Sequence, residues 1–202
     1  MQDMTGRADA WQRAMVVVLV PLAAYFLLQH ALPRLHMTEA GYGDYYWSRR
    51  FWLLAHTAGG LLAIVLGPLQ FSRTLRTQRP ALHRFTGKVY LLAVATAATC
   101  AFVLAGTSQI SASYEWGLIL GASLWLATGL LAYAAIRRRA VTRHRAWMVR
   151  NYTITFFFIV FFAAYDIAQY AGYTDVVAYA GPLVLGSLLV PLALVELVLR
   201  AR

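Results

Sequence analysis

The sequence predicts an all-α fold, a polytopic membrane protein built as a bundle of six transmembrane helices. Of its 202 residues, 60% are hydrophobic and only 13% are charged, whereas soluble domains contain roughly 25% charged residues. The apolar residues form runs of about 20, the length that crosses a hydrocarbon core of roughly 30 Å. Eleven of the eighteen Lys and Arg residues lie in two windows between apolar runs, 73–88 and 137–150, which contain no acidic residue.

We expect the whole chain, residues 1–202, to form a single membrane domain. The first apolar run ends at Pro33 and is not followed by a small-residue cleavage site. We therefore interpret it as an uncleaved helix and not as a signal peptide. The predicted helices span about 12–32, 51–71, 84–106, 114–136, 145–170 and 176–199.

The connections between these helices carry glycine, proline and interfacial aromatic residues. Gly41 and Gly43 indicate a loop over 33–50, whose tyrosines and tryptophan are typical of a membrane edge. In the basic loop 72–84 we expect Pro80 to break any helix. The later connections are a short serine-rich turn, a second basic loop and a turn with Gly and Asp.

The charge distribution predicts the orientation. Cytoplasmic loops of membrane proteins carry an excess of Lys and Arg, and six spans place both termini on the same side as both basic windows. We therefore expect a multi-pass protein of the bacterial inner membrane with its N- and C-termini in the cytoplasm. The net charge of +10 is explained by this asymmetry, so we expect no nucleic-acid partner.

Cys100 lies in the middle of a span. We expect it to be a core residue, and a single cysteine excludes a disulfide framework within the chain.

Two similar stretches run from a basic loop into an apolar helix. Each begins with His-Arg, at His83-Arg84 and at His144, and each carries a further cation, Lys88 or Arg150. A low-spin b-type haem needs two neutral imidazoles from different helices at similar depth. His83 and His144 meet this condition as inner ligands of the iron. Arg84, Lys88 and Arg150 are then candidates to contact haem propionates or anionic lipid headgroups.

A second group of polar residues is predicted at the opposite, outer side. His56 is the outer candidate for a haem ligand, with His30 at similar depth. Asp166 is the most costly residue of the spans, because a carboxylate there needs a partner or water. Its candidate partners are His56, His30 and the arginine pair Arg49 and Arg50.

Alternatives to a haem protein follow from the same residues. A His beside an Arg at a helix start is also typical of a side chain that snorkels or binds lipid phosphate. The rival hypothesis is a non-enzymatic accessory protein that binds anionic lipid through its basic loops, as a subunit of a larger membrane complex. The absence of a chain of acids through the middle argues against a secondary transporter. The sequence has no zinc or nucleotide motif, and whether the protein is an enzyme stays open.

Several motifs resemble a bacterial family of predicted membrane proteins, domain of unknown function 2306. They are His56-Thr57-Ala58-Gly59-Gly60, Gly67-Pro68-Leu69-Gln70-Phe71, Leu82-His83-Arg84, Gly87-Lys88-Val89-Tyr90 and the stretch from Arg143 to Arg150. The resemblance covers about 50–160 and implies an all-helical membrane protein with no established activity. A more distant likeness is to two-haem b-type membrane cytochromes, although the predicted fourth helix carries no histidine for the usual two pairs of ligands. The leading hypothesis is a haem b electron-transfer protein that works with a quinone or another redox partner in the lipid bilayer.

Overall fold

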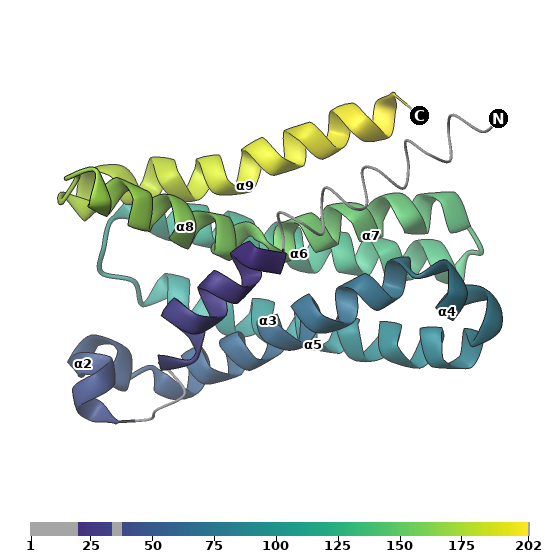
Figure 1. Cartoon of the computed structure of the whole chain (residues 1–202), viewed down its shortest axis with the longest axis horizontal. Coiled ribbons are helices and arrows are strands. Elements are labelled where there is room, and N and C mark those ends of the chain that lie inside the picture. Colours follow the sequence, from purple (N-terminus) through teal and green to yellow (C-terminus); the bar gives the residue numbers. More distant parts are fainter. Residues whose placement is uncertain (1–19, 34–37, 202) are drawn as a thin grey trace.

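Long apolar helices form the body of the protein (Figure 1). The computed structural model describes residues 20–33 and 38–201, and within them all regular secondary structure is helical. The helices are the π-helical turn η1 (Leu27–Ala31), α2 (Glu39–Trp47), α3 (Arg50–Phe71), α4 (Arg73–Gln78), α5 (Pro80–Gly106), α6 (Ala112–Arg137), α7 (Val141–Thr155), α8 (Phe157–Tyr170) and α9 (Val176–Arg200).

Five segments of the described chain are long and apolar enough to cross a membrane. They are α3, α5, α6, the α7–α8 pair and α9. Figure 1 shows them side by side along the long axis of the molecule. Helix α3 packs against α5, α6 packs against both α5 and α7, and α9 packs against α6 and α8. Because consecutive spans alternate in direction, α5 and α7 run the same way.

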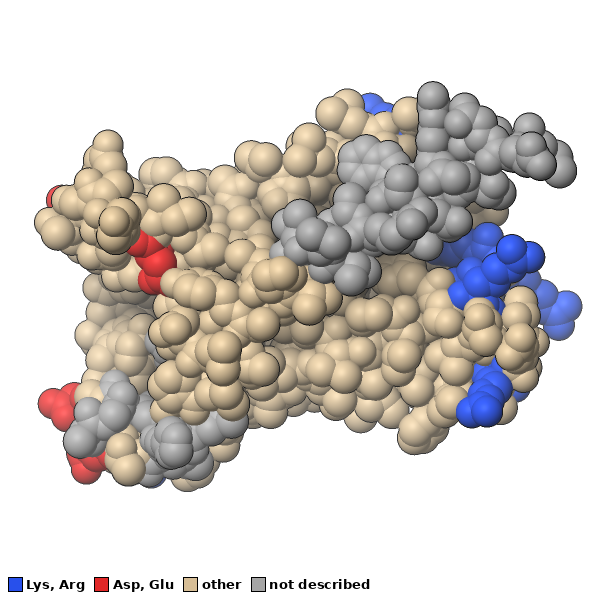
Figure 2. All heavy atoms as spheres, in the orientation of Figure 1, with Lys and Arg blue, Asp and Glu red and all other residues tan. Residues whose placement is uncertain are grey.

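Charge divides the molecule into two ends (Figure 2). We call the end formed by α4, the start of α5 and the α6–α7 turn the basic end, because both arginine-rich windows lie there. We call the opposite end, formed by α2, the α5–α6 turn and the α8–α9 turn, the acidic end. The predicted segregation of the basic windows onto one side of the bundle is therefore confirmed.

The predicted helices agree with the structure within a few residues for five spans. The predicted spans from 51–71 onward correspond to α3, α5, α6, α7–α8 and α9. The first predicted helix, about 12–32, lies largely outside the described residues. Its described part is helical from residue 20 and continues into the π-helical turn η1. The count of six spans stays a prediction.

Two predicted loops are wrong in most of their length. The stretch 33–50 contains α2, which is kinked at Gly43, where φ is +64°. The glycine lacks a Cβ and adopts this conformation at no steric cost. The basic stretch 72–84 contains α4, whose N-terminus is capped by the Ser72 side chain. Pro80 then begins α5, because a proline at the first helical position lacks only an N–H that would be unpaired there anyway.

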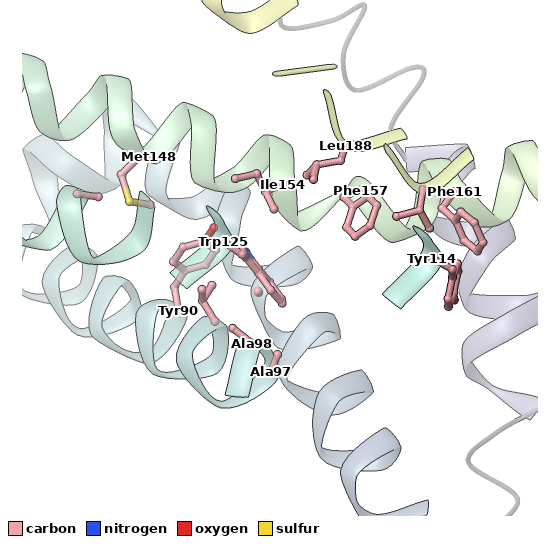
Figure 3. Close-up of a cluster of buried hydrophobic side chains, with 14 of the residues drawn as sticks. Tyr90, Ala97, Ala98, Tyr114, Trp125, Met148, Ile154, Phe157, Phe161 and Leu188 are labelled. Atoms are coloured by element: carbon pink, nitrogen blue, oxygen red, sulfur yellow. The ribbon is translucent and has the colours of Figure 1, made fainter. Parts of the chain in front are cut away.

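The fifth predicted helix, 145–170, is one span made of two helices. It begins earlier than predicted, at Val141, and it is interrupted at Phe156 between α7 and α8. Figure 3 shows Phe157 and Phe161 of this segment in a cluster with Tyr114 and Leu188.

Small residues let the helices approach closely. A methyl group on Gly59 would lie 2.9 Å from the Ala93 carbonyl oxygen of α5, and one on Gly117 would overlap the Val184 side chain of α9. Close backbone approach of this kind is the usual role of small residues in membrane helices. Cys100 is buried within α5, as predicted.

Candidate functional site

A cavity of about 160 Å³ enters the acidic half of the bundle. Its walls come from the segment before α2 and from α2, α3, α5, α6, α7 and α8. Most of the lining is aromatic or aliphatic. The polar and titratable side chains on the wall are His30, Tyr45, Tyr46, Arg49, His56, Thr57, Ser108, Tyr114, Trp125 and Thr155. Apolar walls with a few polar groups are typical of ligand sites.

His56 lies on the cavity wall in a fixed orientation. Its Nδ1 lies 2.9 Å from the carbonyl oxygen of Ala97 on α5, so Nδ1 carries a proton and donates it. In the neutral ring, Nε2 then carries a lone pair. Trp125 and Phe158 pack edge-on against the ring, with centroids 6.4 and 6.1 Å away. A histidine whose Nδ1–H is held by a carbonyl is oriented like a metal ligand or a hydrogen-bond acceptor.

Arg49 lies at the same wall, just before α3. Its Nε donates to the Tyr45 carbonyl oxygen at 2.9 Å, and its Nη1 donates to the Thr107 carbonyl oxygen at 2.9 Å. The guanidinium lies 3.5 Å from the centroid of the Tyr45 ring. Its Nη2 is buried and has no hydrogen-bond partner among the described residues. A buried donor without a partner is unusual in proteins and calls for an explanation.

Tyr45 is held by the same arrangement. Burial disfavours the charged form of its phenol, but hydrogen bonds from Arg49, Ser108 and Gln109 outweigh this and hold the pKa of Tyr45 below the usual tyrosine value. The aromatic residues of 33–50 therefore include part of a cavity wall, beyond the membrane-edge role predicted for them.

Asp166 of α8 holds the N-terminal segment onto the bundle. Its Oδ2 lies 2.7 Å from His30 Nε2 and accepts a hydrogen bond from the Tyr25 hydroxyl at 2.6 Å. The His30 ring also lies 4.3 Å, between centroids, from Phe162. Of the partners predicted for Asp166, His30 is the one that contacts it in the structure. Tyr25 is a second partner, which the comparison of residue depths in the membrane did not include.

His83 and His144 both lie at the basic end, near the starts of α5 and α7. His144 Nδ1 lies 2.9 Å from the Ala132 carbonyl oxygen and donates to it. His83 Nδ1 is buried without a hydrogen-bond partner in the described part of the chain. Each histidine is the fourth residue of its helix, and the hydrogen bond between Tyr90 and Asn151 holds α5 and α7 in the same register of 61 residues. Both predicted ligands therefore lie at the same end of two parallel helices.

The remaining predicted cations have different surroundings. Arg150 forms a two-pronged ion pair with Glu196 of α9, in which its Nε and Nη2 donate to the two carboxylate oxygens, the latter at 3.0 Å. It also lies over the Trp147 ring, 4.7 Å from the centroid. Lys88 lines a groove of about 290 Å³ between α5 and α6, and Tyr133 is also on its wall.

A central polar cluster lies between the cavity and the histidine pair. Its members are Tyr90, Trp125, Thr128, Asn151 and Thr155. The Tyr90 hydroxyl donates to Asn151 Oδ1 at 2.6 Å, and Asn151 Nδ2 donates to the Trp125 carbonyl oxygen at 2.7 Å and to Thr128 Oγ1 at 2.9 Å. Trp125 Nε1 donates to Thr155 Oγ1 at 3.0 Å. Figure 3 shows Tyr90 and Trp125 pointing toward each other in the core.

Sequence reasoning placed Asn151 in the inner layer and did not find this cluster. It also did not find Arg49 as a wall residue of the cavity. Arg49 is the residue before α3, and its backbone is not helical, so helical spacing from His56 could not have placed its side chain. The neighbouring residues Gly59 and Gly60 have different surroundings. Gly59 packs against α5, whereas Gly60 lines the cavity and has open space beside its Cα.

Comparison with known proteins gives a family and no closer relative. The family model described as Predicted membrane protein (DUF2306) matches residues 53–199, more than half of the chain. No curated protein and no solved structure matches the chain significantly. Within the described residues, no group of three or more His, Cys, Asp or Glu side chains is arranged to hold a metal ion.

Proposed function

The chain belongs to the DUF2306 family of predicted membrane proteins, and we propose on separate grounds, from its own residues, that it is an electron-transfer protein holding a b-type haem between His83 and His144. The observation that supports the proposal is the register of α5 and α7, which places these two histidines at the same level of the basic end. Each is the fourth residue of its helix, and the hydrogen bond between Tyr90 and Asn151 has the same offset of 61 residues.

The residues present fit such a group. The Ala132 carbonyl oxygen fixes the ring of His144 through Nδ1 and so leaves Nε2 as the coordinating atom, the arrangement common among histidine ligands. His83 has a buried nitrogen without a partner, which is unfavourable unless something outside the described residues supports the ring. When bound, the haem would supply a one-electron couple whose potential is set by its axial ligands.

Two basic side chains near His83 can pair with the propionate carboxylates of a haem. Arg84 follows His83 directly, and Lys88 lies about one turn further along α5. Both side chains are exposed at the basic end and can pair with propionates. Arg150 is engaged with Glu196, so we assign it to holding α7 against α9.

We limit the proposal to one haem. His56 was predicted as an outer ligand and does line the cavity. The second histidine of that wall, His30, is bonded through Nε2 to Asp166. That nitrogen is therefore already in use, and the described part of the outer side contains no other histidine that could serve as the second ligand.

We further propose that the protein lies in the bacterial inner membrane with its basic end and both termini in the cytoplasm. The positive-inside rule supports this orientation, because the two arginine-rich windows lie together at one end of the bundle. The haem would then lie on the cytoplasmic side.

The test is the reduced-minus-oxidised absorption spectrum of protein purified from haem-replete cells. We expect b-type bands in the wild type and their loss in the double variant His83→Ala/His144→Ala. His56→Ala is the matched control and should retain the bands. A wild-type protein without b-type bands would overturn the proposal, and bands that persist in the double variant would overturn the ligand assignment. Circular dichroism of each variant verifies that the helices are intact.

A second candidate function is binding of anionic lipid as an accessory membrane subunit. The groove between α5 and α6 favours it, since the groove is apolar along Leu91 and Leu92 and has Lys88 on its wall. An acyl chain fits such a wall and a phosphate fits the ammonium group. This function predicts colourless protein that binds cardiolipin vesicles less tightly as salt increases. Binding that is insensitive to salt would contradict it.

A further inference from the structure

The cavity at the acidic end presents one acceptor and one donor to a ligand. His56 donates from Nδ1 to Ala97, so its Nε2 can only accept in the neutral ring. Arg49 has no acceptor atom, and its Nη2 is a buried donor without a partner among the described residues. Both side chains line the same cavity. A ligand that satisfies both must offer a hydroxyl group to His56 and an oxygen acceptor to Arg49.

The spacing of the two residues sets the size of the ligand. Arg49 directly precedes α3 and His56 follows seven residues later, a separation of roughly 10 Å at a helical rise of 1.5 Å per residue, and both side chains line the same cavity. Two oxygens on opposite sides of a six-membered ring, each extended by a hydrogen bond of about 2.8 Å, span a comparable distance.

The walls favour a flat and apolar body between these two ends. Rings of Tyr45, Trp125 and Phe158 line the cavity, and Gly60 leaves open space on the α3 side. Aromatic side chains stack on flat rings. Since the cavity is formed by helices that are apolar enough to span a membrane, a lipid-soluble ring is favoured over a water-soluble phenol with the same oxygens.

We propose that this cavity binds the head group of a lipid-soluble quinol, with one hydroxyl donating to His56 Nε2 and the opposite oxygen accepting from Arg49. The binding site is argued from the cavity alone, whereas its place in electron transfer rests on the proposed function. Tyr45 and Thr107 already hold the guanidinium through Nε and Nη1, which leaves Nη2 as the donor for the ligand.

The test is a titration of the purified full-length protein with decylubiquinol, a short-tailed quinol, under anaerobic conditions. Quenching of tryptophan fluorescence reports binding, because Trp125 lies on the cavity wall. We expect saturable quenching in the wild type. Arg49→Gln and His56→Leu should each weaken the affinity by about tenfold or more, the loss of a hydrogen bond to a charged or buried group.

Matched variants keep the result interpretable. Arg50→Gln changes the neighbouring arginine, which lies over the Trp47 and Phe51 rings and does not line the cavity, so its affinity should equal that of the wild type. Arg49→Lys keeps a positive donor and should bind more tightly than Arg49→Gln, which separates loss of the contact from misfolding. His83→Ala should bind quinol normally, so failure of the haem proposal and failure of this one are distinguishable.

Two results would overturn the inference. Equal quinol affinities for the wild type, Arg49→Gln and His56→Leu would place the ligand elsewhere. Tighter binding of 4-hydroxybenzoate than of decylubiquinol, with the same dependence on Arg49 and His56, would identify the occupant as a water-soluble phenol.

Discussion

The Tyr90 hydroxyl donates a 2.6 Å hydrogen bond to Asn151 Oδ1 and so ties α5 to α7 in the middle of the bundle. Both side chains are fully buried. The two residues are 61 positions apart in the chain, as are His83 and His144 at the basic end. The equal offset is the register of two parallel helices. A helix pair aligned in this way brings both pairs of residues together at once.

Removal of this hydrogen bond should destabilise the bundle moderately. Tyr90→Phe leaves Asn151 Oδ1 without its donor, and we expect a loss of about 1 kcal/mol, because hydrogen bonds between membrane helices contribute about that much or less. Thermal unfolding in detergent measures the change. Tyr133→Phe is the control, since its hydroxyl accepts only from Arg137 at the exposed surface, and an equal loss in that variant would contradict a special role for Tyr90.

A methyl group at Gly67 should be poorly tolerated. Its Cβ would overlap the Tyr152 ring, whose hydroxyl donates to the Ile64 carbonyl oxygen across α3 and α7. Overpacking of this kind costs roughly 1–3 kcal/mol, so Gly67→Ala should lower the midpoint of unfolding. The matched variant Gly186→Ala, where nothing lies within 4 Å of the added methyl group, should not. Equal stability of the two variants would contradict the observed contact between α3 and α7.

The ion pair of Arg150 and Glu196 should couple α7 to α9. A double-mutant cycle with Arg150→Gln and Glu196→Gln should give a coupling energy of up to about 1 kcal/mol, the range of partly exposed pairs. The cycle of Arg200 with Glu196 is the comparison, because these groups lie 4.0 Å apart and Arg200 is 82% exposed. A coupling energy for Arg200 equal to that for Arg150 would rule out the assigned geometry.

Loss of the Asp166 carboxylate should loosen the N-terminal segment. Asp166→Ala removes the acceptor of both Tyr25 and His30, so hydrogen exchange over residues 20–33 should become faster while exchange in α5 stays unchanged. Mass spectrometry of deuterated peptides measures this. Asp44→Ala, at the exposed acidic end, should leave both regions unaffected, and slow exchange in Asp166→Ala would show that other contacts hold the segment.

The proposed orientation predicts the accessibility of engineered cysteines. In a Cys100→Ser background, a cysteine at Thr77 of α4 should react with a membrane-impermeant thiol reagent only in inverted vesicles. A cysteine at Thr174, in the turn between α8 and α9, should react only in intact cells or spheroplasts. The opposite pattern would place the basic end outside.

The five described spans were predictable from sequence to within a few residues, because an apolar run of about 20 residues has only one stable arrangement in a bilayer, a helix that satisfies its own backbone. Glycine and proline were less reliable as signals for loops between the helices. Gly43 allows a kinked helix as readily as a loop, and Pro80 is as compatible with a helix start as with a break. Local composition does not distinguish these outcomes.

Sequence by itself therefore determined the helical class, the five described spans and the two charged ends. Only the tertiary structure decided which side chains meet. Depth admitted several partners for Asp166, and the rotation and tilt of the packed helices selected His30 and Tyr25. The same rotation paired Arg150 with Glu196 and placed Arg49 beside His56 on one cavity wall. Hydropathy reports position along the membrane normal, whereas pairing depends on the angle around each helix axis, which is set by the packing of neighbouring helices.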